Sequence, residues 1–398
     1  MSKKTQQRIL FITQWPFEDP LVQTYTLPYL RIIQKITSCY PYVVTINKND
    51  NSIIVKRKGG VISIQIPSGK RLLFCGWLLN ILSLRKIIRK KSIKILHPWC
   101  TTAGAVGAIL KILDKRLKLH IDSFEPHAEA MVENKTWRKS GLKYNVLFYF
   151  EKLEARIADH LIFAAPGMEN YIQNKYKTKV VNYSVKPACI DLRDFSISKV
   201  KNPELVNKYN LQDKIVCVYA GKFGGIYLED ETFQFIKCCE NYWGKDKFRF
   251  LLLSNTCEDY IKDKSIKFDI EPFITIKLFV PHKDVPQYMG LADFAISSVK
   301  PVPTKKYCTP IKDGEYWALG LPVVIPPDIS VDSDIIRENR AGAILESFDE
   351  VGYLKAIGEI DSIIKGKSRE AVYNKIRPLA EKYRNFRIAE DVYREIYQ

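Results

Sequence analysis

Apolar and polar positions along the chain alternate in blocks that predict strands and helices in regular succession. In the first half, short apolar runs bounded by turn residues predict strands at residues 8–13, 41–46, 93–97, 117–122, 160–164 and 179–183. Longer stretches with helical spacing lie between them, at residues 21–36, 101–113 and 142–158. A run at 53–66 with Gly59-Gly60 at its middle predicts a hairpin inserted into this succession.

The second half repeats the same succession. Its predicted strands lie at residues 215–220, 248–253, 273–278, 294–297 and 322–325, and two final helices are predicted at 368–383 and 386–397. Repeated strand–helix units form parallel sheets that helices cover on both faces. We therefore expect an α/β chain with two Rossmann-like domains that face each other across a cleft, joined near residue 190.

The composition is that of a folded protein without a membrane span. The 398 residues are enough for two full cores, and 46% of them are apolar while 27% are charged. No apolar run approaches the roughly 18 residues of a membrane span, and the first run, at 9–12, is too short for a secretion signal. Nine scattered cysteines without a Cys-x-x-Cys pair favour reduced thiols, so we expect a cytoplasmic protein.

Charge is distributed unevenly along the chain. The net charge is +18, with 33 basic and 14 acidic residues in 1–200 against 29 and 30 in 201–398. Nucleic-acid binding would require these cations on a known module with stacking aromatics, and the sequence contains none, so we expect no nucleic acid. An anionic membrane or a phosphate-bearing acceptor fits an excess confined to the first half; general solubility charge is the alternative.

One basic stretch has two structural interpretations. Residues 70–91 combine apolar positions with clusters of Lys and Arg at both ends, and residues 51–100 contain no acid. Such a helix can lie in a membrane interface with its cations toward anionic headgroups. It can equally be a core helix with a solvated basic end. The charge excess of the first half favours the membrane interpretation.

Residues 308–324 carry the most specific chemical signal. A loop, Cys308-Thr309-Pro310, precedes a predicted helix that starts near Ile311 and leads into an apolar strand. The helix start offers backbone N–H groups and a positive dipole end to phosphate oxygens. Glu315 lies about one turn into the helix, where its carboxylate can accept hydrogen bonds from ribose hydroxyls. An ordinary αβ unit with Lys312 solvated at its surface is the alternative.

Two further segments of the second half suit the same ligand. Between a predicted strand and helix, residues 218–226 contain Gly221-Lys222 and Gly224, so that backbone and one cation can approach a phosphate. Residues 280–293 form a loop that begins at Val280 and a short helix that ends at the next strand. A glycine turn after a strand is common, so each segment alone is a weak signal.

In this order the three segments resemble the nucleotide-sugar site of family 4 glycosyltransferases of the GT-B fold. That family carries Ser-Pro-x-Lys-x-x-Glu-Tyr followed by Gly-x-Pro-Val-Val, which residues 309–324 match at Pro310, Lys312 and Glu315. The resemblance implies that cations and helix-start N–H groups hold the diphosphate, and that Val280 borders the base. The donor-binding residues that it implies are Gly221, Lys222, Gly224, Val280, Pro310, Ile311, Lys312, Asp313 and Glu315.

The chain also departs from that family. Lys222 stands where the family has an arginine, and the family's second diphosphate lysine is missing. A lysine is a point charge rather than a bidentate fork, so phosphate binding has less geometric control. Tyr307 replaces the first glutamate of the Glu-x7-Glu motif. After the first strand, residues 13–20 lack the Gly-Gly pair of many relatives, so access for the acceptor can differ.

The candidates for the acceptor side lie in the first half. Asp122, Glu125 and His127 follow a predicted strand, where α/β sheets place their sites. By resemblance we expect His127 and Asp122, together with Lys222, to be the catalytic residues. Glu125, Gln14 and His97 are further acceptor-side candidates. A capping role for the aspartate, a surface histidine and a buried packing role for His97 are the alternatives.

The resemblance implies a retaining hexosyltransferase of polysaccharide biosynthesis. It would move a hexose from a UDP- or GDP-type nucleotide sugar to a glycan acceptor, expected to be lipid-linked, on the inner face of the membrane. We expect no cofactor and no metal. The acceptor domain would comprise residues 1–190, completed by the helix near 384–398, and the donor domain residues 191–383.

Two alternatives to the transferase stay open. A nucleotide-sugar 2-epimerase of the same fold would need acid and base groups around the hexose, which only the Asp122–His127 cluster could supply. A non-catalytic basic protein that binds membranes or polyanions could keep the scaffold without the reaction. The missing diphosphate lysine and Tyr307 favour this second alternative.

Overall fold

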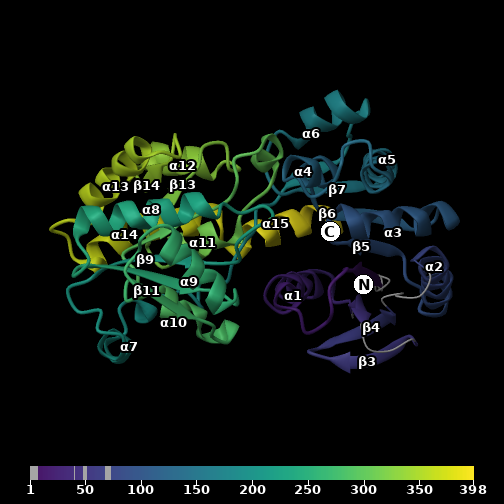
Figure 1. Ribbon diagram of the computed structural model, residues 1–398. Helices are drawn as coiled ribbons and strands as arrows, with labels where there is room; N and C mark the ends of the chain where they lie inside the picture. Colours follow the sequence, from purple (N-terminus) through teal and green to yellow (C-terminus); the bar gives the residue numbers. More distant parts are fainter. Residues whose placement is uncertain (1–7, 40, 48–51, 68–72) are drawn as a thin grey trace. The chain divides into compact units, whose positions relative to one another are not determined.

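The computed structural model describes residues 8–39, 41–47, 52–67 and 73–398. It divides into two compact units. Unit 1 comprises Met1–Val132, Trp137–Pro187 and Arg387–Gln398, and unit 2 comprises Glu133–Thr136 and Ala188–Phe386. Each unit is built around one sheet with helices on both faces (Figure 1).

The sheet of unit 1 has eight strands in the order β3-β4-β2-β1-β5-β6-β7-β8. All neighbours are parallel except the hairpin β3–β4, which is antiparallel. The strands are β1 (Ile9–Ile12), β2 (Tyr42–Asn47), β3 (Ile54–Lys58), β4 (Val61–Pro67), β5 (Ile95–Pro98), β6 (Lys118–Phe124), β7 (His160–Phe163) and β8 (Tyr183–Val185). The strand order reverses between β1 and β5, because the chain builds first to one side of β1 and then to the other.

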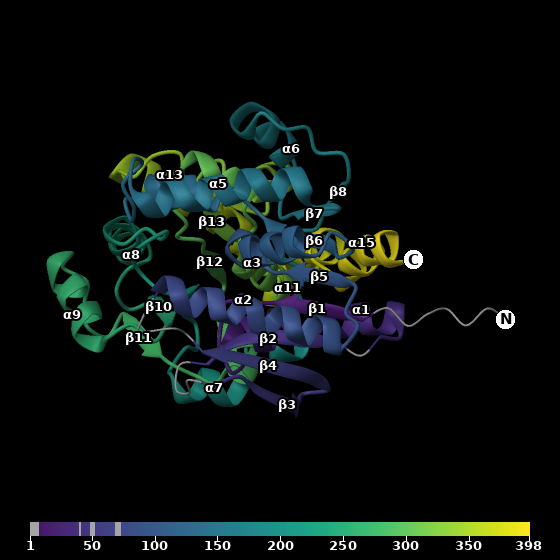
Figure 2. The same cartoon turned by 90° about the vertical axis from the view of Figure 1, so that its right-hand side faces the viewer.

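Helices of unit 1 cover both faces of this sheet (Figure 2). They are α1 (Leu27–Thr37), α2 (Leu73–Lys90), α3 (Cys100–Leu113), α4 (His127–Glu133), α5 (Leu142–Ile157), α6 (Met168–Tyr171) and the C-terminal α15 (Phe386–Tyr397). Successive side chains of a strand point to opposite faces. On β6, Leu119 packs against Gly107 of α3, whereas Asp122 meets Tyr393 of α15. The C-terminal helix therefore packs on the first sheet, as predicted.

The sheet of unit 2 has six parallel strands in the order β11-β10-β9-β12-β13-β14. They are β9 (Ile215–Ala220), β10 (Phe248–Leu253), β11 (Thr275–Leu278), β12 (Phe294–Ile296), β13 (Val323–Ile325) and β14 (Gly342–Ile344). The central strands β9 and β10 are each buried at all but one position, as expected for a parallel sheet covered on both faces. Its strand order reverses between β9 and β12.

Two hydrophobic clusters lie on the two faces of this second sheet. One cluster joins the sheet to α10, α11, α12 and α14, and the other joins it to α8, α9 and α13. The helices are α7 (Pro203–Lys208), α8 (Asp230–Trp243), α9 (Glu258–Lys267), α10 (Val285–Met289), α11 (Ile311–Ala318), α12 (Asp332–Asn339), α13 (Glu350–Ile364) and α14 (Arg369–Tyr383). The predicted α/β class with two parallel sheets is confirmed.

Several local predictions can be compared with the structure. The hairpin at Gly59-Gly60 is confirmed, whereas the strand predicted at 179–183 lies at Tyr183–Val185. The three-residue strand β14 was not predicted. The eight cysteines that the structure describes are all free. Among the described helices, none is long and apolar enough to cross a membrane.

The helix predicted over 70–91 corresponds to α2, and the described side chains of its second half pack into the core. Ile81, Leu84 and Ile88 are each at most 3% exposed. Their spacing places them on one helical face, and α2 contacts β4 and α3. Residues 70–72 lie outside the described residues, as do the side chains through Leu79. For its second half, the core interpretation is the correct one.

Helix α5 buries two carboxyl groups against the rest of unit 1. Glu151 accepts hydrogen bonds from the Ala128 N–H (2.8 Å) and the Tyr176 hydroxyl (2.9 Å). Burial nevertheless raises the pKa of Glu151 to about 8. Burial and the charge of Glu151 also raise the pKa of Glu154, whose carboxylate lies against Gly104 of α3. Both groups favour the neutral form in the folded protein.

These carboxyls make the stability of unit 1 depend on pH. Because the folded pKa of Glu151 lies above its unfolded value of 4.5, stability falls as pH rises from about 5 to about 8. We expect Glu151→Gln to remove most of this loss, worth about 3 kcal/mol near pH 7 at 1.36 kcal/mol per pKa unit. Denaturant unfolding at pH 5, 6, 7 and 8 measures the free energy of unfolding of the wild type and the variant. Exposed Glu338→Gln is the control; equal pH dependence of both variants would contradict this assignment.

Candidate functional site

The clearest candidate site lies at the carboxyl edge of the unit 2 sheet, where the strand order reverses. In open α/β sheets, ligands bind outside the carboxyl ends of the two strands that flank such a reversal. Here these strands are β9 and β12, which are neighbours in the sheet. Residues 221–229 follow β9, and residues 297–300 follow β12. The glycine turn predicted from the sequence is therefore at this point.

The loop after β9 is held in a shape that exposes its backbone. Gly224 and Gly225 have φ angles of 83° and 61°, which lie in the left-handed region that favours glycine. The Tyr219 hydroxyl donates a hydrogen bond to the Lys222 carbonyl (2.5 Å). A Cβ atom at Gly221 would lie 3.0 Å from that hydroxyl, so the position has little room for a side chain. The side chain of Lys222 is exposed.

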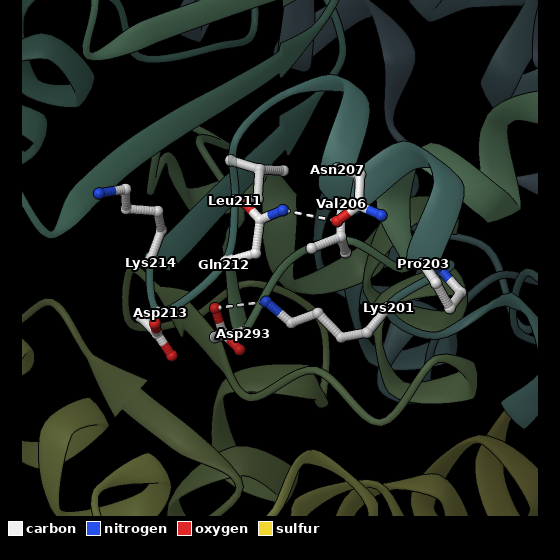
Figure 3. Close-up of a pocket in the computed structure, with 9 residues that line it drawn as sticks. All are labelled: Lys201, Pro203, Val206, Asn207, Leu211, Gln212, Asp213, Lys214 and Asp293. Atoms are coloured by element: carbon white, nitrogen blue, oxygen red, sulfur yellow. Dashed lines mark hydrogen bonds and ion pairs between the residues drawn. The ribbon is translucent and has the colours of Figure 1, made fainter.

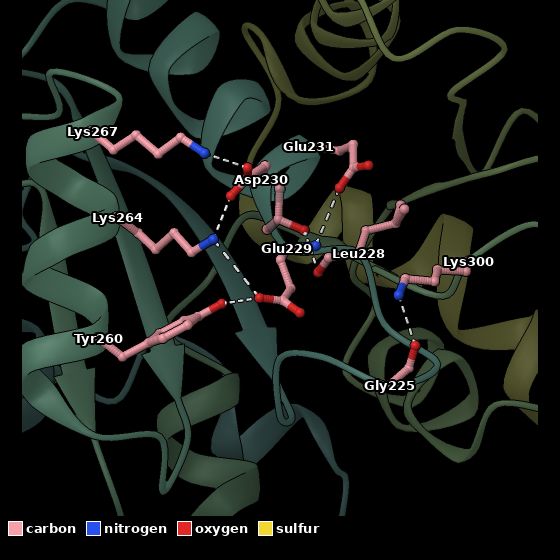
Figure 4. A network of polar contacts seen from close by, with 10 residues as sticks. Gly225, Leu228, Glu229, Asp230, Glu231, Tyr260, Lys264, Lys267 and Lys300 are labelled. Atoms are coloured by element: carbon pink, nitrogen blue, oxygen red, sulfur yellow. Dashed lines mark hydrogen bonds and ion pairs between the residues drawn. The ribbon is translucent and has the colours of Figure 1, made fainter. Parts of the chain in front are cut away.

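The same loop is fixed to the segment after β12 (Figure 4). The Leu228 N–H donates to the Ser298 carbonyl (2.7 Å), and the Lys300 N–H donates to the Ile226 carbonyl (3.0 Å). The Lys300 ammonium donates to the Gly225 carbonyl (2.8 Å). Lys300 thus adds a second cation beside the glycine loop. The sequence analysis did not single out Lys300, although its position just after β12, one of the two strands that flank the reversal, pointed to this edge.

Two acidic residues at the start of α8, Glu229 and Asp230, are paired with side chains of α9 (Figure 4). Asp230 accepts from Lys264 and Lys267, and Glu229 accepts from the Tyr260 hydroxyl. The Lys264 ammonium also lies 3.8 Å from Glu229. These pairs partly compensate the negative charge of Glu229 and Asp230 beside the glycine loop. That charge therefore repels an anionic ligand less strongly.

The start of α11 supplies backbone donors and the Lys312–Glu315 pair. The N-cap residue is Pro310, and no side chain caps the helix, so the first-turn N–H groups from Ile311 onward are not used by a side-chain cap. The Lys312 ammonium lies 2.6 Å from the Glu315 carboxylate. The Lys312 side chain is 36% exposed and that of Glu315 only 6%. The lysine therefore orients a largely buried carboxylate one turn into the helix.

One hydrogen bond joins the two predicted segments. The Ala220 N–H, at the end of β9, donates to the hydroxyl of Tyr316 in α11 (2.9 Å). Tyr316 and Trp317 are fully buried between the sheet and the surrounding helices. Burying each aromatic ring contributes roughly 1.5–3 kcal/mol, so α11 is held firmly beside the glycine loop. The segments that were separate in the sequence form one edge.

The segment after β11 also reaches this edge. Val280 is half-buried, and His282 is close enough to Glu315 and Lys312 for their charges to act on it. Burial lowers the pKa of His282, and the lysine lowers it further, while the glutamate raises it. The structure therefore brings together three charged or ionisable groups from two segments that the sequence separates by 30 residues or more.

Asp313 differs from its predicted neighbours because its side chain points into the core. It is fully buried beside Asp332, which forms a buried ion pair with Arg384. Burial, followed by the charge of Asp332, raises the pKa of Asp313 well above its ordinary value. Burial also raises the pKa of Asp332, although Arg384 opposes it. Of Asp313, only the backbone N–H can serve the edge.

The chain contains one Asp-x-Asp sequence, Asp332-Ser333-Asp334. Two carboxylates at this spacing can share one cation when both are accessible. Here Asp332 is buried against Arg384, and Asp334 forms a surface pair with Arg337 (2.9 Å). The two carboxylates are therefore engaged separately by arginines.

Two of the acceptor-side candidates lie in a buried network of unit 1. The Asp122 carboxylate accepts from the Tyr393 hydroxyl (2.6 Å), lies 3.3 Å from His97 Nε2 and pairs with the Lys186 ammonium at 3.2 Å. Burial alone would raise the pKa of Asp122, but Lys186, His97 and Tyr393 outweigh it and lower the pKa. Because Asp122 and His97 are fully buried, this network favours the structural alternative for both residues.

The Lys186 ammonium is also surrounded by aromatic rings. It lies 4.0 Å from the centroid of Tyr29, 5.2 Å from Trp99 and 5.8 Å from Tyr393. Such cation–π contacts partly replace the water that a buried ammonium loses. His97 Nδ1 lies 2.5 Å from the Tyr397 hydroxyl, so two tyrosines of α15 complete this network.

The other acceptor-side candidates are accessible. Glu125 and His127 lie together after β6, with Oε1 3.8 Å from Nδ1, and their side chains are 28% and 34% exposed. Gln14 is exposed and follows β1, one of the two strands that flank the reversal in unit 1. Glu125, His127 and Gln14 thus remain candidates for contact with a ligand, and the structure does not bring Gln14 into a described contact with the other two.

A separate pocket lies at the opposite, amino edge of the unit 2 sheet (Figure 3). It is lined by residues that precede β9 and β12, and its centre is an ion pair between Lys201 and Asp293 (2.9 Å). Asp293 also accepts from the Val216 N–H (2.9 Å). The carboxylate therefore ties two strands together, which is a structural role.

Comparison with known proteins gives structural relatives only. No protein-family model and no curated protein sequence matches the chain. Among solved structures, sucrose-phosphate synthase from Thermosynechococcus elongatus is 14% identical with a TM-score of 0.72, over 98% of this chain and 99% of that one. WaaG, a glycosyltransferase involved in lipopolysaccharide biosynthesis, is 12% identical with a TM-score of 0.72 over the same shares.

A third similar structure is HepE from Anabaena in complex with UDP. It is 13% identical to this chain, with a TM-score of 0.70 over 98% of this chain and 99% of that one. These similarities extend over almost the full length of both partners. The chain therefore has the GT-B fold, and the predicted fold is confirmed.

Proposed function

We propose that the chain is a glycosyltransferase that takes its sugar from a nucleotide diphosphate sugar. The observation that carries this proposal is the convergence of the glycine loop after β9 and the start of α11 at the reversal of the unit 2 sheet, joined by the Ala220–Tyr316 hydrogen bond. In the similar structures, HepE is in complex with UDP, UDP and glucose, or UDP-glucose. A UDP sugar is therefore the donor that we propose first, with a GDP sugar second.

We assign the donor's parts to particular groups. The diphosphate lies against the N–H groups at the start of α11, between the cations Lys222, Lys300 and Lys312. The ribose hydroxyls donate to Glu315, and the base lies near Val280. Lys300 supplies the second positive charge that this chain lacks at the family's lysine position, because its ammonium already contacts the glycine loop.

The reaction that we propose is transfer of a hexose with retention of configuration. In such a reaction the protein positions the acceptor hydroxyl and stabilises the charge that develops on the leaving diphosphate. Lysine ammonium groups and helix-start N–H groups serve that charge, and the departing phosphate can take the acceptor's proton. Glu125 and His127 are the side chains of unit 1 that we propose to contact the sugars.

The acceptor that we propose is a lipid-linked glycan at the cytoplasmic face of a membrane. The support is the charge of the first half of the chain, with 33 basic and 14 acidic residues in 1–200. A lipid-linked acceptor requires a protein that works close to anionic headgroups, and basic side chains favour that position.

The two alternative functions are less well supported. An epimerase would need Asp122 and His127 as an acid/base pair, but Asp122 is fully buried and paired with Lys186. A non-catalytic binding protein has no need for Glu315, a largely buried carboxylate that Lys312 holds at the helix start. Both observations favour the transferase.

The test is incubation of the protein with UDP and GDP sugars, with and without lipid-linked oligosaccharide. Release of nucleoside diphosphate together with a longer acceptor is the expected result. A changed sugar without acceptor would establish the epimerase instead. Absence of binding by any nucleotide or nucleotide sugar would contradict both enzyme functions.

Lys222 is expected to bind the diphosphate, so Lys222→Ala should raise the donor KM about tenfold, because a charge-assisted hydrogen bond at an exposed site contributes about 1.5 kcal/mol. Lys222→Arg should keep the KM near the wild-type value, since the guanidinium binds phosphate bidentately. Steady-state kinetics with varied donor measures both. Lys214→Ala, at the amino edge of the same sheet, is the matched control; an equal effect there would contradict the assignment.

A further inference from the structure

Helix α5 of unit 1 carries an apolar stripe on its solvent side. Leu142 is 79% exposed, Val146 46% and Tyr149 62%. Their spacing of four and three residues places them on one face of the helix. We refer to these three residues as the outer face of α5. Single exposed apolar residues are common, but three on one helical face require an explanation.

The opposite face of α5 is accounted for by packing within the unit. Tyr144 and Leu147 are buried and form a cluster with Ala128, against which Trp137 packs. Glu151 and Glu154, the helix's two acidic residues, are fully buried. The helix therefore turns both of its carboxyl groups inward and leaves none beside the outer face.

Basic residues surround the outer face. The exposed side chains of Arg138 and Lys139 lie just before the helix, and Lys143 and Arg156 are exposed on it. No acidic residue occurs between Glu133 and Glu151. The charged groups on the solvent side of α5 are thus all cations, whereas an ordinary surface helix mixes both signs of charge.

A second helix with exposed apolar residues shows the contrast. On α13 of unit 2, Val351 is 77% and Leu354 41% exposed. Acidic residues Asp349 and Glu350 stand at the start of that helix. Exposure of apolar residues is therefore not special to α5, but the presence of cations without acidic residues distinguishes its exposed face from that of α13.

We propose that the outer face of α5, with the cations around it, is the surface by which the protein docks on a bilayer that contains anionic lipids. Apolar side chains enter the boundary of headgroups and acyl chains, while lysines and arginines contact the phosphates. The basic residues are complementary in charge to anionic lipid. A second copy of the chain is a less suitable partner, because its own outer face is equally basic. The inference deepens the proposed lipid-linked acceptor, but its evidence is independent of the donor site.

The proposal differs from the one that the sequence favoured. Of the two interpretations of the stretch 70–91, the charge excess favoured a helix in the membrane interface, but the described half of α2 packs Ile81, Leu84 and Ile88 into the core. Helix α5 has a row of exposed apolar residues, and the described half of α2 has no such row. The two helices can be separated by substitution.

The experiment measures flotation of the full chain with vesicles of phosphatidylcholine alone or with about a third phosphatidylglycerol. The wild type should float with the anionic vesicles and release at high salt. The variant Leu142→Gln/Val146→Gln/Tyr149→Gln should reduce its partitioning at least tenfold, and Arg138→Gln/Lys139→Gln/Lys143→Gln should do the same. The matched control Val351→Gln/Leu354→Gln should float like the wild type, and circular dichroism should show all variants folded.

Several results would overturn the proposal. They are equal flotation of the wild type and the outer-face variant, equal binding to neutral vesicles, or loss of binding by Lys86→Gln/Lys90→Gln of α2 with no loss by the outer-face variant. A dimer of the wild type that the outer-face variant abolishes would assign the face to a second copy. The assay contains no nucleotide sugar, so donor binding without vesicle binding would overturn this inference alone.

Discussion

Replacement of Glu315 by Gln should lower kcat/KM for the nucleotide sugar by roughly 10–100-fold. In the donor site that we propose, this carboxylate accepts hydrogen bonds from the ribose hydroxyls, and bonds to a charged group contribute about 1.5–3 kcal/mol. The Gln side chain keeps the size and loses the charge. It also loses the ion pair that now joins Glu315 to Lys312 at 2.6 Å.

A nucleotide that lacks the 2′-hydroxyl of its ribose makes this test specific. Wild-type protein should bind UDP more tightly than 2′-deoxy-UDP, whereas the Glu315→Gln variant should bind the two equally, because the partner of the hydroxyl has been weakened. Calorimetric titration measures the four affinities. Glu346→Gln, a surface carboxylate of unit 2 paired with Arg337, should leave all of them unchanged. Unaltered discrimination by Glu315→Gln would refute the ribose role.

Arg384→Met should be the most destabilising single substitution that we predict for unit 2. Arg384 is 1% exposed, forms an ion pair with the buried Asp332 and packs its alkyl chain against Gly314 of α11. Removing one partner of a buried pair leaves the other charge uncompensated, which costs about 3–5 kcal/mol. For a unit of this size the midpoint of thermal unfolding should fall by roughly 10 °C.

Two further variants check the physical reason. Arg337→Met removes a half-exposed arginine from surface pairs and should change the midpoint little. The double variant Asp332→Leu/Arg384→Met removes both buried charges and should be more stable than Arg384→Met alone. Differential scanning calorimetry compares them. A double variant less stable than either single variant would contradict the uncompensated-charge explanation.

The sequence allowed most of the fold to be predicted, together with the main segments of the donor edge that we propose. Strands such as β9 and β10 are continuous apolar runs, and the helix that starts at Ile311 is followed by a glycine and a buried strand. These signals are local, because periodicity and turn residues act over a few positions. Lys222, Lys312 and Glu315 were identifiable because each lies within such a local motif.

The burial of individual polar residues could not be predicted in the same way. Asp122 looks like an exposed strand-end carboxylate, but its partner Tyr393 is 271 positions further along the chain. Asp313 also looks like an exposed carboxylate in the sequence. In the structure it is buried beside Asp332, near Arg384 at the end of α14. Long-range packing decided both cases. Lys300 was also missed: its position just after β12 was a signal, but its contact with Gly225 spans 75 positions.

The central claim is that the carboxyl edge of the unit 2 sheet binds a nucleotide diphosphate. Amide hydrogen exchange, with and without UDP or GDP at saturating concentration, tests it most directly. We predict slower exchange in residues 221–226 and 309–316 when one of the nucleotides is bound, and no slowing around the Lys201–Asp293 pocket at the amino edge. Unchanged exchange in both segments, or protection confined to another part of the chain, would contradict the donor site.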